Sequence, residues 1–258
     1  MNAYFHLSYA VASFIITLTS QIYLWGWLTN TIVPVTIDNK PSSWDTLVLL
    51  PDSPVINNIL LIIVFALQHS MLARRTVKAI ISTCLPDGFE RIVYNVTTAI
   101  TMYLMFLLWE PLPRIIWHIT IPWLRYIVIV VRLGFILASM KSLGLFSLDG
   151  ISGIYGIRQP ASHLMKRESP KVSLITTGIF GIVRHPAMSF FIGTLIVTPT
   201  MTTSQLLFAI TMTIYIVVSV LYLEERDLIH QFGSQYEEYK KTTPAFIPSL
   251  WRSHNSND

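Results

Sequence analysis

The sequence PAMSFFIGTLIVTPTMTTSQLLFAITMTIYIVVSVLYL, residues 186–223, contains no Asp, Glu, Lys, Arg or His. As one straight helix this run would extend ~57 Å, almost twice the ~30 Å hydrocarbon core of a bilayer. Pro199 and the threonines that follow it favour a break near the middle of the run. We therefore expect a helical hairpin, which returns both ends of the run to the same face of the membrane. The charged residues that flank the run would then be neighbours in space, namely Arg184, His185, Glu224 and Glu225.

The whole chain is poor in charge. Of its 258 residues, 52% are hydrophobic and 12% are charged, and the mean hydropathy is +0.55. Soluble domains carry about 25% charged residues, so we expect an all-α integral membrane protein with one domain over residues 1–258. Apolar runs predict about six transmembrane helices, at roughly 7–30, 55–73, 92–109, 123–145, 186–201 and 204–223. The first of these, from Leu7 to Trp27, lacks the basic start and the cleavage site of a signal peptide, so we expect it to be retained.

Basic residues are distributed unevenly between the predicted loops. With six spans, the loops after the second and fourth spans share one side with the C-terminal tail and together hold 13 Lys and Arg residues, whereas the opposite loops hold 3. Cytoplasmic loops are enriched in Lys and Arg, so we expect both termini in the cytosol. The net charge of +4 fits such loops better than nucleic-acid binding. The single cysteine, Cys84, excludes an internal disulfide and a cysteine-cluster metal site, and no metal centre is predicted.

The charged residues that bracket the hairpin have two interpretations. They are either a solvated collar at the membrane surface or parts of a binding site. Pro186 suits the first turn of a helix, where unpaired amides and the helix dipole attract an anion near Arg184 and His185. Glu224 and Glu225 would accept hydrogen bonds from hydroxyl or ammonium groups. A zwitterionic ligand that carries a sugar would therefore suit such a site.

Polar residues also occur inside the predicted spans. Gln68, His69 and Ser70 lie near the cytoplasmic end of the second span, and Arg132 lies about nine residues into the fourth. Polar groups at this depth either bond to neighbouring helices or belong to functional sites. For Gln68, His69 and Ser70 a helix-packing hydrogen bond is the favoured interpretation. For Arg132 a structural pairing and a ligand contact are equally open.

Two further segments flank the hairpin. Before it, Gly178 and Gly181 allow close backbone approach, but no GxGxxG follows a strand, so a Rossmann nucleotide site is not supported. After it, LEERDLIHQFGSQYEEYKK, residues 223–241, predicts a cytosolic amphipathic tail helix near lipid headgroups. We expect Phe246, Leu250 and Trp251 to rest at the same interface.

Several motifs together resemble one superfamily of membrane enzymes. An RHP element, an uncharged hairpin, an EE pair and FGxxYxxYKK resemble the isoprenylcysteine carboxyl methyltransferases and phospholipid methyltransferases. Further segments are similar to its nurim branch, which includes bacterial methanethiol S-methyltransferases: IVPVTID (32–38), LQHSML (67–72), ERIVY (90–94), WEPLP (109–113), GIRQ (156–159) and TPTMTTSQLLFA (198–209). The resemblance covers nearly the whole chain. It implies an integral-membrane methyltransferase with S-adenosyl-L-methionine as its cofactor.

The resemblance also implies roles for individual residues. The RHP element lines the cofactor pocket in the superfamily, and the first acidic residue of the EE pair contacts the cofactor. By this match the residues expected to bind the cofactor are Val172, Ser173, Leu174, Ile175, Phe180, His185, Pro186, Met188, Glu224 and Glu225. The residues expected to act in catalysis are Arg184, His185 and Glu224.

The sequence departs from the superfamily pattern at two positions. Met188 stands where the RHPxY form has a tyrosine, and Val220 stands where the prenylcysteine enzymes have an arginine. A prenylated protein carboxylate is therefore a poor substrate for this chain. Arg158 and Gln159 match a GLRQ-like element of the nurim branch to which we assign no role.

These expectations converge on methyl transfer to a small thiol, as in the conversion of methanethiol to dimethyl sulfide. Displacement at a sulfonium depends mainly on positioning and desolvation, and the thiolate is the competent nucleophile. We expect Arg184 and His185 to lower the pKa of the thiol or to hold the cofactor carboxylate, and Glu224 to bind hydroxyl or amine groups of the cofactor. Two alternatives stay open: a nurim-like, non-catalytic protein of the nuclear envelope, and a methyltransferase with a lipid or other lipophilic acceptor. Retention of both RHP and EE favours an enzyme.

Overall fold

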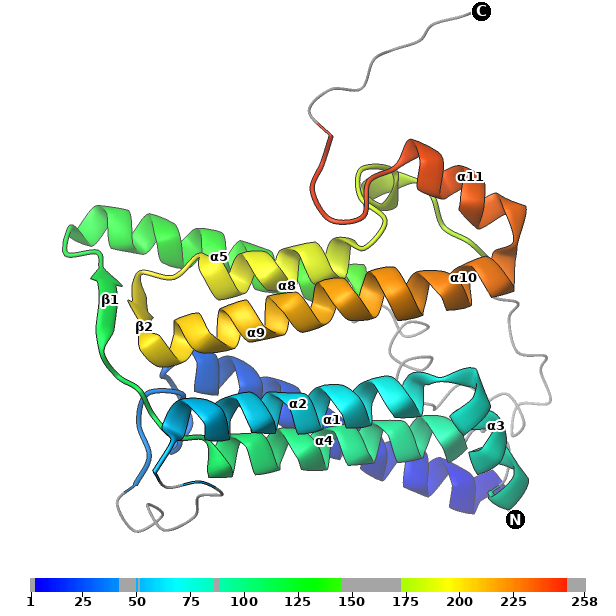
Figure 1. Ribbon diagram of the computed structural model, residues 1–258, viewed down its shortest axis with the longest axis horizontal. Coiled ribbons are helices and arrows are strands. Elements are labelled where there is room, and N and C mark those ends of the chain that lie inside the picture. Colours follow the sequence, from blue (N-terminus) through cyan, green and yellow to red (C-terminus); the bar gives the residue numbers. More distant parts are fainter. Residues whose placement is uncertain (1–2, 42–49, 51, 86–88, 145–172, 250–258) are drawn as a thin grey trace, which may run out of the picture.

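Helices form most of the part of the chain that the structure describes. The computed structural model describes residues 3–41, 50, 52–85, 89–144 and 173–249 (Figure 1). Its α-helices are α1 (Ala3–Thr29), α2 (Pro54–Ala73), α3 (Arg75–Cys84), α4 (Phe89–Leu108), α5 (Pro122–Ser142), α8 (Pro186–Ile196), α9 (Thr203–Ser219), α10 (Glu225–Phe232) and α11 (Ser234–Thr242). The remaining elements are a 3₁₀ turn η2 (Gly178–Gly181), a π-helical turn η3 (Val220–Glu224), and two strands, β1 (Ile115–His118) and β2 (Thr200–Thr202).

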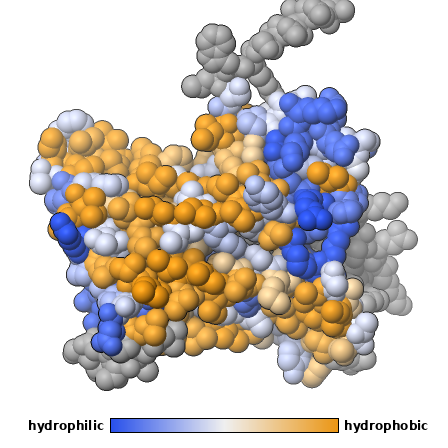
Figure 2. Space-filling model, viewed as in Figure 1, coloured by the Kyte–Doolittle hydropathy of each residue, from blue (hydrophilic) through white to orange (hydrophobic). Residues whose placement is uncertain are grey.

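Five of the described helices are long and apolar enough to cross a membrane. They are most of α1, the whole of α2, α4 and α5, and the continuous helix formed by α9, η3 and α10. Figure 2 shows apolar residues along the flank of the bundle, and hydrophilic residues gathered where α10 and α11 lie. The prediction of an all-α, multi-pass integral membrane protein is therefore confirmed. We call the end of the bundle with α10 and α11 the tail end, and the end with β1 and β2 the strand end (Figure 1).

The uncharged run folds back on itself as expected, but its first arm is short. α8 ends at Ile196 and α9 begins at Thr203. Pro199 cannot continue a helix, because it has no N–H and disfavours helical geometry in the residue before it. With 11 residues, α8 extends ~16 Å, so the helix expected over 186–201 is shorter than predicted. The second arm is longer than predicted, because the helix that starts with α9 continues to Phe232.

A small antiparallel sheet at the strand end was not expected from the sequence. β1 pairs with β2, and Trp117 lies opposite Met201. β1 lies between Pro113 and Pro122, which interrupt any helix, and its isoleucines and tryptophan favour extended structure. The sheet ties the segment before α5 to the turn of the hairpin.

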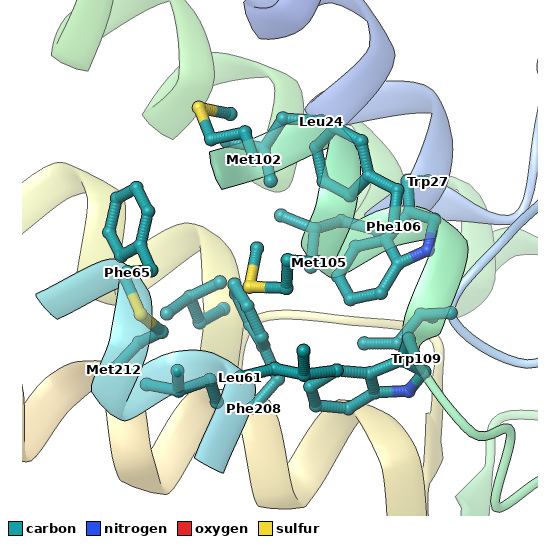
Figure 3. Close-up of a cluster of buried hydrophobic side chains, with 14 of the residues drawn as sticks. Leu24, Trp27, Leu61, Phe65, Met102, Met105, Phe106, Trp109, Phe208 and Met212 are labelled. Atoms are coloured by element: carbon teal, nitrogen blue, oxygen red, sulfur yellow. The ribbon is translucent and has the colours of Figure 1, made fainter. Parts of the chain in front are cut away.

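A buried aromatic cluster holds α1, α4 and α9 together (Figure 3). The ring centroid of Trp27 lies 5.2 Å from that of Trp109 and 5.4 Å from that of Phe208. Met105 and Phe106 of α4 fill the space beside these rings. Lipid tails are as apolar as these side chains, so close packing stabilises the cluster more than the exclusion of water does.

Candidate active site

The two motifs that bracket the hairpin meet at the tail end, as the sequence predicts. Glu225, the first residue of α10, is 1% exposed. Its Oε1 accepts hydrogen bonds from Nε of Arg184 at 3.0 Å and from Nη2 of the same residue. Its Oε2 lies 2.7 Å from Nζ of Lys240 on α11. One buried carboxylate therefore joins the segment before α8 to the tail.

The Arg184 guanidinium bonds to protein groups through all three of its nitrogens. Besides its two bonds to Glu225, it donates through Nη1 to the backbone carbonyls of Lys240, at 3.1 Å, and Thr243. Its side chain is 6% exposed. This arrangement favours a positioning role for Arg184, and its direct action on a thiol or on a cofactor carboxylate stays a prediction.

The backbone amides of the two residues before α8 are occupied as well. The Arg184 N–H donates to the carbonyl of Pro244 at 2.9 Å, and the His185 N–H donates to the carbonyl of Ala245 at 3.0 Å. We call residues 243–246 the tail strap. The tail strap therefore supplies acceptors for the amides of the two residues that precede α8. The expectation that unpaired amides in the first turn of α8 attract an anion stays a prediction.

Glu224 differs from its neighbour in exposure. It is the last residue of η3, and its side chain is 47% exposed. The turn is widened because the Glu225 N–H bonds to the carbonyl of Val220, and such π-helical turns are frequent at functional sites. The acidic pair is therefore divided. Glu225 points into the cluster of cations, whereas Glu224 presents a carboxylate that is open to a ligand.

His185 lies between the two acidic side chains. Its Nδ1 is 3.6 Å from Oε1 of Glu224, and its Nε2 is 3.4 Å from Oε1 of Glu225. The Tyr236 hydroxyl lies 3.5 Å from the same Nε2, and the ring of Phe246 is 5.9 Å from the imidazole. The imidazole thus connects the open carboxylate to the buried ion network.

One face of α11 packs on this site. Tyr236 and Tyr239 are buried, and the Tyr239 hydroxyl donates to the carbonyl of Phe180. Burial raises the pKa of Tyr236, and the nearby charge of Glu225 raises it further; burial also raises the pKa of Tyr239. The sequence reasoning missed this docking and the role of Lys240. The signal was the spacing of the two tyrosines, which places them on one face of an otherwise polar helix.

The segment before α8 holds most of the other residues expected at a cofactor site. Ser173 and Ile175 are exposed and Leu174 is half-buried, in backbone that is neither helix nor strand. Phe180 in η2 and Met188 in the first turn of α8 are half-buried, and Pro186 is buried. Five residues named from the sequence lie outside the described part of the chain: Arg158, Gln159, Val172, Leu250 and Trp251.

The sequence is similar to those of several curated proteins. No protein-family model and no solved structure matches the chain. Methanethiol S-methyltransferase 1 of Bradyrhizobium diazoefficiens is 33% identical over 245 residues, which are 95% of this chain and 81% of that protein. The chain belongs to the methanethiol S-methyltransferase family. The resemblance predicted from its motifs is confirmed, and the chain is a membrane methyltransferase.

Two further relatives show the breadth of this similarity. Methanethiol S-methyltransferase of Mycobacterium tuberculosis is 30% identical over 254 residues, which are 96% of this chain and 98% of that protein. Nurim of Bos taurus is 26% identical over 168 residues, which are 63% of this chain and 64% of that protein. The similarity to nurim is thus both weaker and shorter.

In this methyltransferase three polar residues near the end of α2, Gln68, His69 and Ser70, form hydrogen bonds to neighbouring helices. The partners are Thr97 and Thr101 for Gln68, Tyr94 and Thr98 for His69, and Tyr215 for Ser70. These hydrogen bonds agree with the helix-packing interpretation.

Arg132 also bonds to protein groups. It is 8% exposed, and it donates to the carbonyl of Thr194 and the hydroxyl of Thr198, both at 3.2 Å, and to the carbonyl of Leu28 at 3.4 Å. These bonds tie α5 to the ends of α8 and α1, toward the strand end. The geometry favours the structural interpretation of Arg132.

Proposed function

We propose that this enzyme transfers the methyl group of S-adenosylmethionine to methanethiol, giving dimethyl sulfide, at the tail end of the bundle. The division of the acidic pair carries the proposal. Glu225 neutralises the buried guanidinium of Arg184, whereas Glu224 keeps a half-exposed carboxylate beside a buried imidazole. The names of the curated relatives support the choice of methanethiol as the acceptor.

The residues around Glu224 fit the polar and apolar parts of S-adenosylmethionine. The carboxylate of Glu224 would accept hydrogen bonds from the ribose hydroxyls or the ammonium group. The irregular backbone of residues 173–175 would offer amides and carbonyls to the adenine, and Phe180 and Met188 would offer apolar contacts. Pro186 would border the same site. When bound, S-adenosylmethionine supplies an electrophilic methyl group on a positively charged sulfur.

The contribution of the protein to the reaction is positioning and the exclusion of water. In-line displacement gains most from fixing the two reacting atoms in a dry site. His185 would hold the Glu224 carboxylate through Nδ1, and Arg184 would fix His185 by tying the start of α8 to Glu225. Glu225 therefore acts on the cofactor through its neighbours. Because the thiolate is the nucleophile, the site must also accept the proton of the thiol.

The test of this function uses the purified protein in detergent. Calorimetry measures the binding of S-adenosylmethionine, and headspace gas chromatography measures dimethyl sulfide formed from added methanethiol. We expect both binding and product. Absence of cofactor binding would support a nurim-like, non-catalytic protein. Binding without dimethyl sulfide would support another acceptor, such as a lipid headgroup.

A matched pair of variants tests the role of Glu224. Glu224→Ala should weaken cofactor binding on the order of 10-fold to 100-fold, since a hydrogen bond to a charged group contributes about 1.5–3 kcal/mol. Glu238→Ala on α11 removes a carboxylate that is 68% exposed, and it should bind the cofactor like the unchanged protein. Equal binding by both variants would contradict the role of Glu224.

We also propose that the tail end faces the cytosol. α1 begins at the end of the bundle where α11 lies, and the basic residues Arg74, Arg75 and Lys78 lie at the same end (Figure 1). The single cysteine offers a direct test, because Cys84 ends α3 at this end and is exposed. A thiol reagent that cannot cross membranes should label Cys84 in inside-out vesicles and spare it in intact cells. The reverse labelling would overturn this orientation.

A further inference from the structure

A second group of polar side chains lies between α2, α4 and α9. Nε2 of His69 is 2.8 Å from the Tyr94 hydroxyl, and its Nδ1 is 3.3 Å from the hydroxyl of Thr98. The next residue on α2, Ser70, lies 3.1 Å from the hydroxyl of Tyr215 on α9. We call His69, Ser70, Tyr94 and Tyr215 the inner polar cluster. Polar groups at membrane depth are costly and are usually paired or functional.

This cluster adjoins the open carboxylate of the site. Tyr94 bonds to His69, and the neighbouring Ser70 bonds to Tyr215 on the helix that carries Glu224. Tyr215 is nine residues before Glu224 on one continuous helix, which places the two ~13 Å apart along the axis. Nη1 of Arg74, at the end of α2, donates to the carbonyl of Leu223 at 3.3 Å. The end of α2 is therefore fixed against η3, and the inner polar cluster lies deeper in the membrane than Glu224.

His185 and His69 have different surroundings. His185 lies between two carboxylates and a phenol, within the ion network of the tail. The bonds of His69 go to hydroxyl groups, and its ring stacks on Phe65 with centroids 5.2 Å apart. A neutral imidazole in a partly dry site is a suitable proton acceptor. The neighbouring amide of Gln68 forms two hydrogen bonds to α4. These bonds already join the two helices, so packing alone does not require a histidine at position 69.

We propose that the inner polar cluster binds the acceptor as a small neutral thiol, and that His69 takes the proton from its sulfur while Tyr94 orients the imidazole. This inference rests on the proposed function and identifies the residues of the same site that would bind the methyl acceptor. The S–H bond breaks, and its proton goes to the ring nitrogen of His69 that carries no hydrogen, in place of the hydroxyl group that is hydrogen-bonded there. The sulfur electron pair forms the new S–C bond with the methyl group, and the pair of the broken sulfonium C–S bond stays on the departing sulfur. The proton then leaves His69 for water past Tyr94 and Glu224.

The variants His69→Gln and Tyr94→Phe test the proposal, with Gln68→Leu as the matched control. Gln68→Leu removes bonds between the same two helices without changing His69. Near neutral pH we expect His69→Gln to lower methanethiol turnover about 10²-fold to 10³-fold, and Tyr94→Phe to lower it less. Cofactor binding should match the unchanged protein in all three variants, which also establishes that they fold.

The pH dependence separates a proton acceptor from a packing residue. The titratable and charged groups that face the cluster are Tyr94 and Arg91 of α4, Tyr215 of α9, Glu224 of η3 and Arg74 after α2. Without His69, turnover depends on thiolate formed in solution, so it should rise about tenfold per pH unit below the pKa of the thiol. The unchanged protein should level off at a lower pH. A profile for His69→Gln parallel to that of the unchanged protein, or a loss equal to that of Gln68→Leu, would overturn the proposal.

A readout without cofactor completes the test. In the cofactor-free protein, added methanethiol should shift the imidazole NMR signal that His69→Gln lacks, and it should leave the other histidine signals unchanged. A thiol that moves only the signal of His185 would overturn the assignment to His69. If the unchanged protein binds no cofactor and forms no dimethyl sulfide, the proposed function itself fails; normal turnover with an unresponsive His69 refutes this inference alone.

Discussion

The divided acidic pair predicts that two adjacent glutamates respond differently to the same change. Glu225→Gln removes the charge that faces Arg184, whose side chain is 6% exposed, and leaves a buried guanidinium without its counter-ion. Breaking a buried ion pair from one side costs about 3–5 kcal/mol. The loss of the contact to Lys240 adds little to this destabilisation, because the Lys240 side chain is 45% exposed. A loss of this size lowers the melting temperature on the order of 10 °C.

The assay is thermal unfolding of the purified protein in one detergent, with cofactor binding measured in parallel. Glu224→Gln should keep the melting temperature within a few degrees, roughly what an exposed pair contributes, and yet lose cofactor binding. Glu238→Gln, on an exposed ion pair, is the control for the chemical change itself and should alter neither quantity. Equal destabilisation by Glu224→Gln and Glu225→Gln, or an unchanged melting temperature for Glu225→Gln, would refute the division of the pair.

Three further changes test parts of the fold. The stability of the folded protein should fall as pH rises past about 10, because the unfolded chain loses its tyrosine protons there while the raised pKa keeps Tyr236 protonated; Tyr236→Phe should flatten this dependence in alkaline thermal unfolding. Gly233→Ala should cost about 1–3 kcal/mol from backbone strain alone, since the residue has φ +58° and an added Cβ would meet no atom within 4 Å; Gly134→Ala, also without a contact, should show no such loss. Arg132→Met should lower stability by about 1–3 kcal/mol by leaving buried acceptors unpaired, while calorimetry should find cofactor binding unchanged.

The hairpin and the meeting of its ends followed from local features of the sequence. The absence of charge between Pro186 and Leu223 made the run membranous, and Pro199 limited where it turns. The length of α8 did not follow, because the residues after Ile196 pair with β1, and that partner is far away in the chain. Apolar composition alone does not distinguish a short helix followed by a strand from a full span.

The different surroundings of Glu224 and Glu225 could not be predicted from the sequence either. Both acidic residues follow the same apolar run, and nothing in that run predicts that a π-helical turn ends between them. The bond between Glu225 and Lys240 exists because the chain reverses at Gly233, and the direction of that reversal is set by the tyrosine face of α11. Sequence patterns identified the right segments and left the partners of each side chain open.

Some family motifs have a structural role. IVPVTID, WEPLP and TPTMTTSQLLFA meet at the strand end, away from Glu224. Thr202 donates to Asp38 at 2.6 Å, and the Leu112 N–H donates to the hydroxyl of Ser204 at 2.6 Å. The residues of these motifs fix loops to one another. They therefore contribute to the fold, and no role in the methyl-transfer reaction follows from these contacts.

The tail strap has a consequence for biosynthesis. The amides of Arg184 and His185 obtain their acceptors from Pro244 and Ala245, some sixty residues later in the chain. During translation the earlier helices enter the membrane first, and the proposed site stays incomplete until these late carbonyls emerge from the ribosome. The site proposed here can therefore close only after residue 245 has been made, long after the helices that carry its other residues.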